Sequence, residues 1–130
     1  MNPESVLRTV VLESPAVTAM IGARFTPEPL PQQSVLPACT YQRVSQRIPD
    51  EIPFPTVRIQ VTCWAATRNA ARDLAEAVKK AVRLTGEGWK GQRHGMAIKY
   101  MKPENDLDLI HPDTGRHTVP IDFKVTYRRT

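Results

Sequence analysis

The sequence predicts an α+β domain in which an antiparallel β-sheet is covered on one face by an N-terminal helix and a central amphipathic helix. Apolar and polar residues alternate through Thr56–Trp64 and again through Thr118–Arg128, which is the period of a strand that buries one face. Between them, Arg68–Leu84 places apolar residues at three- and four-residue intervals, which gives a helix one apolar stripe. The order helix, strands, helix, strands favours an antiparallel sheet with helices on one side.

The start of the chain predicts two short helical segments and a brief strand. Apolar residues recur at helical spacing over Val6–Val11, until Ser14 and a proline interrupt the pattern. A second short turn covers Val17–Ile21, and Gly22 suits its C-terminal end because glycine accepts a left-handed backbone at little cost. Arg24–Thr26 then predicts a brief strand.

The span from Pro27 to Pro55 contains seven of the 12 prolines, which excludes long regular structure except between them. The clear gap is Ala38–Ser45, which predicts a strand. Gln46–Pro55 then forms a long polar connection to the central strand. Because this connection contains few apolar residues, it cannot bury enough surface by itself to offset the entropy of ordering, and we expect a neighbouring molecule to supply the rest.

Beyond the central helix, the pattern predicts turns and short strands. Thr85–Gly91 is a glycine-rich turn, and Gly95–Met101 is a short strand that Pro103–Asp106 ends. Leu107–Ile110 forms another short strand. His111–Gly115 has the proline, aspartate and glycine of a tight turn, which leads into the last strong strand.

Length and composition indicate one domain over residues 1–130. A chain of this length with 41% hydrophobic residues can bury one adequate core. No apolar run approaches the roughly 20 residues that cross a bilayer, and the first residues lack the pattern of a signal peptide, so we expect a soluble protein that is cytoplasmic when made and has no membrane partner. Cys39 and Cys63 are expected to be buried small hydrophobes in that reducing compartment.

Two patterns of residues invite a cofactor or metal interpretation, and neither has the context it needs. The glycines of Gly86–Gly91 match the spacing of a dinucleotide-binding loop, but here a helix precedes the loop and a strand follows it. His94, His111 and His117 have no paired metal-ligand spacing. We therefore predict no cofactor and no metal site.

A catalytic interpretation is equally weak. Asp106 and Asp108 project on the same side of a strand, as two catalytic carboxylates would, but a solvated edge also explains them and is preferred. The serines carry no nucleophile-elbow pattern. The sequence therefore predicts no catalytic residue and favours a protein that is not an enzyme.

Four segments together form a recognisable order. They are Val17–Pro27, the strand Pro37–Tyr41, the strand Val57–Ala65 with its Trp-Ala ending, and the alanine-rich helix Ala71–Val78. This order resembles the tail-completion, or tail-terminator, proteins of long-tailed phages, and the resemblance covers most of the chain. It implies a small α+β subunit that forms a ring, often six-fold, at the end of the tail tube that faces the head.

The resemblance further implies that the ring stops tube growth and joins the tube protein to head-side connector proteins, with DNA passing through the lumen without sequence-specific binding. The candidate interaction residues come from the polar connection, from the outward face of the central strand, and from its terminal tryptophan, for which packing is the alternative. They are Gln46, Arg47, Ile48, Asp50, Glu51, Ile52, Phe54, Arg58, Gln60 and Trp64.

Two alternatives of other kinds stay open at this point. Another connector or minor tail protein of the same junction would share this composition. The two are distinguished by the part of a disassembled virion with which the protein stays. A small nucleic-acid-binding module is the other alternative, since the net charge is +5, although the 18 basic residues form no dense block. Such a module would show a steep salt dependence of DNA affinity.

Overall fold

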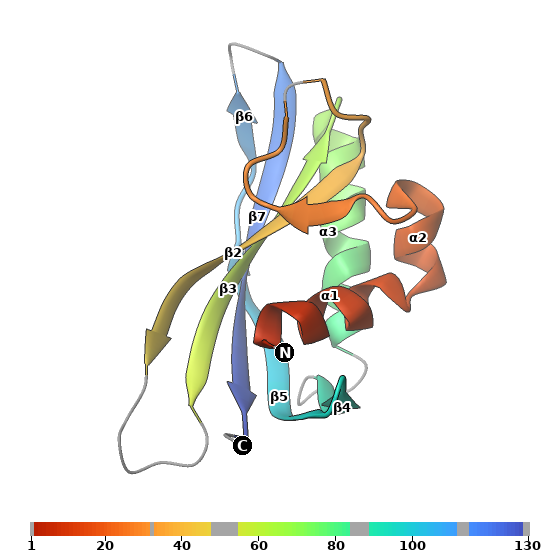
Figure 1. The fold of residues 1–130 in the computed structure, drawn as a ribbon. Helices are drawn as coiled ribbons and strands as arrows, with labels where there is room; N and C mark the ends of the chain where they lie inside the picture. The colour runs from red at the N-terminus through yellow and green to blue at the C-terminus, as the bar shows by residue number, and fades with distance from the viewer. Residues whose placement is uncertain (1, 32, 48–54, 84–88, 112–114, 129–130) are drawn as a thin grey trace.

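The computed structural model describes residues 2–31, 33–47, 55–83, 89–111 and 115–128 (Figure 1). In this part of the chain, three helices lie against one face of a curled sheet. The elements are α1 (Pro3–Leu12), α2 (Pro15–Ile21), β1 (Phe25–Pro27), β2 (Ala38–Arg47), β3 (Thr56–Ala65), α3 (Arg68–Val82), β4 (Trp89–Arg93), β5 (Met96–Asp106), β6 (Leu109–His111) and β7 (Arg116–Tyr127). The α+β prediction, with helices on one face of the sheet, is confirmed.

The sheet is mixed, which corrects the prediction of a strictly antiparallel one. Its strand order is β1-β2-β3-β7-β5-β4, and β6 pairs with β7 beside β5. The pair β1 and β2 is parallel, with Phe25 opposite Cys39, whereas the other strand pairs in the described residues are antiparallel. The reason is the proline-rich connection after β1, which carries the chain back to the level where β1 began instead of making a hairpin.

The central helix forms where its spacing predicts it. The side chain of Thr67 accepts a hydrogen bond from the Ala70 backbone N–H at 3.1 Å and so caps the first turn of α3. The whole predicted apolar stripe is buried against the sheet, and it consists of Ala71, Leu74, Ala75, Val78, Ala81 and Val82. Figure 1 shows α3 running along the sheet, with α1 and α2 beside it in the same layer.

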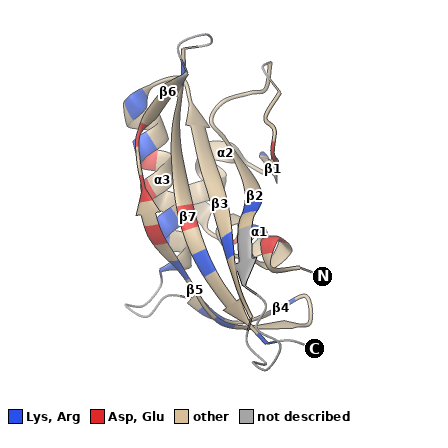
Figure 2. Cartoon of the chain, turned by 90° about the vertical axis from the view of Figure 1, so that its left-hand side faces the viewer, with Lys and Arg blue, Asp and Glu red and all other residues tan. Residues whose placement is uncertain are grey.

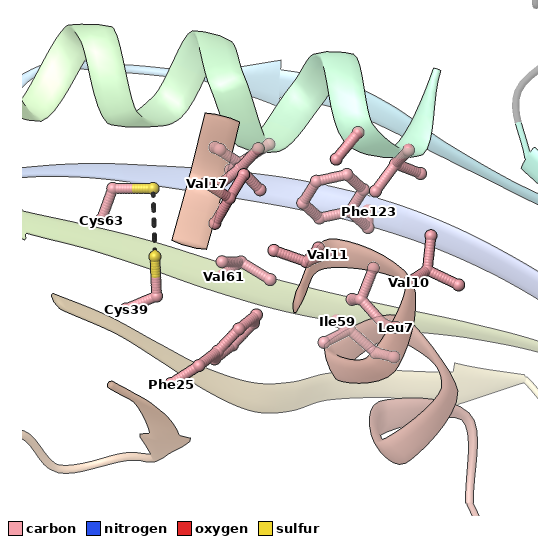
Figure 3. Packing of buried hydrophobic residues seen from close by; sticks show 14 of the residues in the cluster. Leu7, Val10, Val11, Val17, Phe25, Cys39, Ile59, Val61, Cys63 and Phe123 are labelled. Atoms are coloured by element: carbon pink, nitrogen blue, oxygen red, sulfur yellow. Dashed lines mark hydrogen bonds between the residues drawn. The ribbon is translucent and has the colours of Figure 1, made fainter. Parts of the chain in front are cut away.

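The core lies between this helical layer and the inner face of β3 and β7. Leu74, Val78, Ile59 and Val61 are fully buried in one hydrophobic cluster, as their positions on the two apolar stripes predict. Figure 3 shows α1 contributing Leu7 and its neighbours to the same cluster. The alternating residues of β3 and β7 that point away from this core are therefore left on the opposite side of the sheet, here called the open face.

Three predicted boundaries were wrong, and strand pairing explains each. β2 continues through Arg47, because a register shift after Arg43 lets its last residues pair with the start of β3. β4 begins at Trp89, within the expected glycine-rich turn, and pairs with β5. β5 continues through Pro103 to Asp106. This part of β5 lies beyond β4 and is therefore at the edge of the sheet, where a proline costs no hydrogen bond between strands.

Candidate interaction surface

The open face of the sheet carries charged residues of both signs across its central strands. Figure 2 shows them on β3, β7 and β5, on the side away from the helices. Arg58 and Gln60, predicted from the outward face of the central strand, lie here and are half-buried. Gln60 accepts a hydrogen bond from Gln42 of the neighbouring strand at 3.1 Å between Nε2 and Oε1. A polar sheet face that none of the described helices covers suits contact with another macromolecule.

Three cations form a straight row across this face. Lys124 of β7 lies directly opposite Arg58 of β3 on one side and Lys102 of β5 on the other. We call these three residues the cation row. The Arg58 side chain is 41% exposed, and its guanidinium nitrogens lie 3.8 Å from the carboxylates of Glu104 and Asp122. Those distances are ion-pair contacts without hydrogen bonds, so the carboxylates compensate the row only in part.

Hydroxyl groups lie at one side of the cation row. A hydrogen bond with Thr126, followed by the positive charges of Lys124 and Lys102, lowers the pKa of the Tyr100 hydroxyl despite its partial burial. The ammonium of Lys102 lies 5.8 Å from the centre of the Tyr100 ring. The hydroxyl of Thr126 also lies 3.0 Å from that of Thr56 on the next strand. Cations and hydroxyls therefore share one patch.

Trp64 lies on the same side of the sheet, but its ring is largely covered. It is 8% exposed, and its indole N–H donates a hydrogen bond to the hydroxyl of Thr40 at 2.9 Å. The guanidinium of Arg116 lies 4.6 Å from the centre of the ring. Trp89 is similarly buried, with Arg93 at 5.2 Å. Both tryptophans therefore pack within the chain and offer little surface to a partner.

The polar connection after β2 supplies the other predicted interaction residues. The backbone of Gln46 and Arg47 belongs to β2 and pairs with Val57 and Thr56. The side chains of these two residues, and the whole of the following predicted set, lie outside the described residues. That set is Ile48, Asp50, Glu51, Ile52 and Phe54.

Asp106 and Asp108, the pair considered as catalytic carboxylates, are held in an ion-pair network with α3. Arg72 donates from Nη1 to Asp106 Oδ1 at 2.9 Å, and its Nη2 donates to Asp108. Lys79 donates to the other Asp106 oxygen at 2.6 Å, and Arg68 donates from Nε to Asp108 at 3.2 Å. Each carboxylate accepts hydrogen bonds from two cationic side chains, so the network joins the end of β5 and the residues after it to α3.

These contacts change the proton affinity of the groups in the network. The hydrogen bond from Lys79, followed by that from Arg72, lowers the pKa of Asp106 against the opposing effect of partial burial. The hydrogen bonds with Asp106 and Asp108 raise the pKa of the Arg72 guanidinium. The sequence signal for this network is the spacing of Arg68, Arg72 and Lys79, which places three cations on one side of the helix.

The two cysteines meet in the core. Cys39 and Cys63 are directly opposite each other on β2 and β3, with 3.8 Å between their sulfur atoms, and both are fully buried as free thiols (Figure 3). The hydrogen bond with Cys39 and then burial raise the pKa of the Cys63 thiol. The prediction that they are buried small hydrophobes is confirmed.

The remaining motifs bring no chemical site together. Among the residues that the structure describes, no three His, Cys, Asp or Glu side chains are placed to hold a metal ion. His94 lies at a turn, 2.7 Å from the hydroxyl of Thr9. Gly86 and Gly88 lie outside the described residues, and Gly91 lies in β4, so the glycine motif follows a helix and runs into a strand. No described helix is long and apolar enough to span a bilayer.

Two exposed apolar surfaces lie on opposite edges of the sheet. The first, here called the β6 edge, consists of Leu107, Leu109 and Ile110, which are 51%, 45% and 58% exposed. The second is a groove of about 470 Å³ beside β1, here called the proline groove. Its lining includes Pro27, Pro29, Leu30, Pro31 and Val35.

The two surfaces are at the same level of the sheet. One line of paired residues crosses the sheet from β6 to β2. Leu109 of β6 pairs with Thr118 of β7, and Thr118 pairs with Trp64 of β3. Trp64 in turn pairs with Ala38 at the start of β2. β1 pairs with the residues that follow Ala38. A rotation about an axis parallel to the strands would therefore bring the β6 edge of one copy towards the proline groove of the next.

Sheet and helices together define a small α+β protein. The family model described as "Tail completion protein gp17" matches residues 5–128, and the chain belongs to that family. It is a structural tail protein. The fold is similar to that of a chain in the solved virion of a native gene transfer agent (GTA) particle, with a TM-score of 0.63, 11% sequence identity and coverage of 94% of both chains. No curated protein matches the chain.

Proposed function

We propose that the chain completes the tail: it forms a ring at the head-proximal end of the tail tube, ends tube growth and presents the docking surface for head-side connector proteins. The observation that carries this proposal is the family match over nearly the whole chain, residues 5–128. Its role is that of a virion protein at the head–tail junction, in contact with copies of itself, with the tube protein and with a connector.

Ring formation is supported by the two apolar surfaces. A head-to-tail contact joins one surface of a subunit to a different surface of the next, and it closes into a ring when the rotation closes. The β6 edge and the proline groove differ in shape, are both apolar, and lie level on opposite edges of one sheet. Among the described strands β6 pairs with β7 alone, so its outer edge is a template for contact with another chain.

The predicted interaction residues are assigned to the contacts with the tube and the connector. The connection around Ile48, Ile52 and Phe54 offers apolar anchors between polar residues, and Gln60 lies on the adjoining polar surface. A partner that covers those anchors would provide the area that the connection cannot bury alone.

The experiment is complementation of particle assembly in producing cells that lack this chain. Tails should then fail to join heads, and tubes should lack a uniform end; supplying the chain should restore both. The double variant Leu109→Lys, Ile110→Lys charges the β6 edge and should fail to restore joining. Gln92→Lys introduces a lysine at an exposed position of β4, at the other end of the sheet, and should restore it. Normal joined particles in cells without the chain would contradict the proposal.

A further inference from the structure

The cation row places like charges side by side on an exposed face. Lys124 is in direct register with both Arg58 and Lys102, and like charges directly opposite each other on neighbouring strands destabilise a sheet. The nearest carboxylates, Glu104 and Asp122, lie 3.8 Å from Arg58 and towards one side of the row. An anionic ligand that met all three cations would relieve the repulsion that these carboxylates leave.

The groups around the row match those that contact phosphate. Phosphate oxygens in nucleic acids are bound by lysine, arginine and hydroxyl side chains, and these contacts position the duplex without reading its sequence. Here the Tyr100 hydroxyl lies on the side of the row away from the carboxylates, whereas Thr126 is buried and its hydroxyl already meets those of Tyr100 and Thr56. The patch thus offers three cations, with one partly buried hydroxyl beside them.

The dimensions fit a phosphate backbone. Neighbouring strands lie about 4.8 Å apart, so three cations on adjacent strands span roughly 10 Å. A duplex carries one negative charge per about 1.7 Å of its axis, so a row of this length meets several phosphates. Because no described helix projects from the open face to enter the major groove, base reading is not expected.

We infer that the cation row, Arg58, Lys124 and Lys102, binds the phosphate backbone of duplex DNA without sequence preference. The inference rests on the proposed function for the place where DNA is met, at a ring through which it passes. Glu104 and Asp122 limit the attraction. A contact of moderate strength suits DNA that has to move past the protein, because strongly held phosphates would retain it.

The test measures binding of the full chain to a fluorescent 20-base-pair duplex by anisotropy between about 20 and 200 mM salt. With three phosphates neutralised, affinity should fall about 40-fold from 50 to 200 mM salt. The triple variant Arg58→Gln, Lys102→Gln, Lys124→Gln should lose most of the affinity and most of this salt dependence.

A matched triple variant, Arg68→Gln, Lys80→Gln, Arg83→Gln, removes the same charge from exposed positions on and just after α3, which covers the other face of the sheet, and should bind nearly as the native chain does. The variant Glu104→Gln, Asp122→Asn should bind severalfold more tightly. Equal losses in the two triple variants would show only a general charge effect and would overturn the inference, as would the absence of binding at 20 mM salt.

Attachment to tube ends, measured on the same variants, separates this inference from the proposed function. If the row variant loses DNA affinity and still attaches to tube ends, both stand. If native chain binds DNA through the row but never attaches to tube ends, the proposed function fails and the DNA contact remains. If the row variant loses attachment while DNA binding is unchanged, the row contacts a protein and the inference is wrong.

Discussion

Truncating Leu74 tests the packing of the central helix on the sheet. Leu74 is fully buried and is the largest side chain in a stripe otherwise built from alanine and valine, so its neighbours on α3 cannot fill the space that Leu74→Ala would leave. Buried leucines truncated to alanine typically cost 2–5 kcal/mol, and poorly collapsing sites lie in the upper part of that range. We expect a loss of roughly 3–5 kcal/mol in the free energy of unfolding.

Urea denaturation followed by tryptophan fluorescence measures this loss. With a slope of about 1–3 kcal/mol per molar urea, the midpoint should fall by at least about 1 M. Leu107→Ala is the matched control, since Leu107 is half exposed, and its effect should stay within about 0.5 kcal/mol. A loss below about 0.5 kcal/mol for Leu74→Ala would show that the assigned helix orientation is wrong.

The elements with strong local periodicity could be predicted from the sequence. The alternation in β3 and β7 and the stripe of α3 each follow from residues near one another in the chain, and so does the cap at Gly22. The parallel pairing of β1 and the extension of β5 depend on which distant segment lies alongside, and β4 depends on its pairing with β5 across an irregular register. Bulges and register shifts in those pairings leave no fixed local pattern.

The candidate surface was predictable only one strand at a time. Arg58 could be placed on the outward face of the central strand from alternation alone. Its alignment with Lys124 and Lys102 requires the register of three strands, two of which are distant from it in the chain. In the same way, the ion pair of Asp106 with Arg72 could not be predicted from the pattern around Asp106, because the two residues are 34 positions apart.

Two further predictions concern proton binding and thiol reactivity. The lowered pKa of Asp106 means that its ion pairs stabilise the fold above its unfolded pKa of about 3.9, and that this contribution is lost as the pH falls through the lower folded value. Asp106→Asn should therefore cost on the order of 1 kcal/mol at pH 7 in urea denaturation, with a difference from native that shrinks below about pH 4; a pH-independent difference would contradict this. Cys39 and Cys63 should react with a colorimetric disulfide reagent only after unfolding, because both thiols are buried, and rapid reaction of the native chain would show that the β2–β3 core opens.

The most direct test of the proposed role is incubation of the purified chain with tail tubes whose head-proximal ends are uncapped. Electron microscopy of the tube ends, together with sedimentation of the mixture, reports whether the chain assembles there. The proposed role predicts a closed ring at one end of each tube, and an unchanged tube length when more tube protein is added. Chains that stay monomeric beside competent tube ends, with tubes that continue to grow, would contradict it.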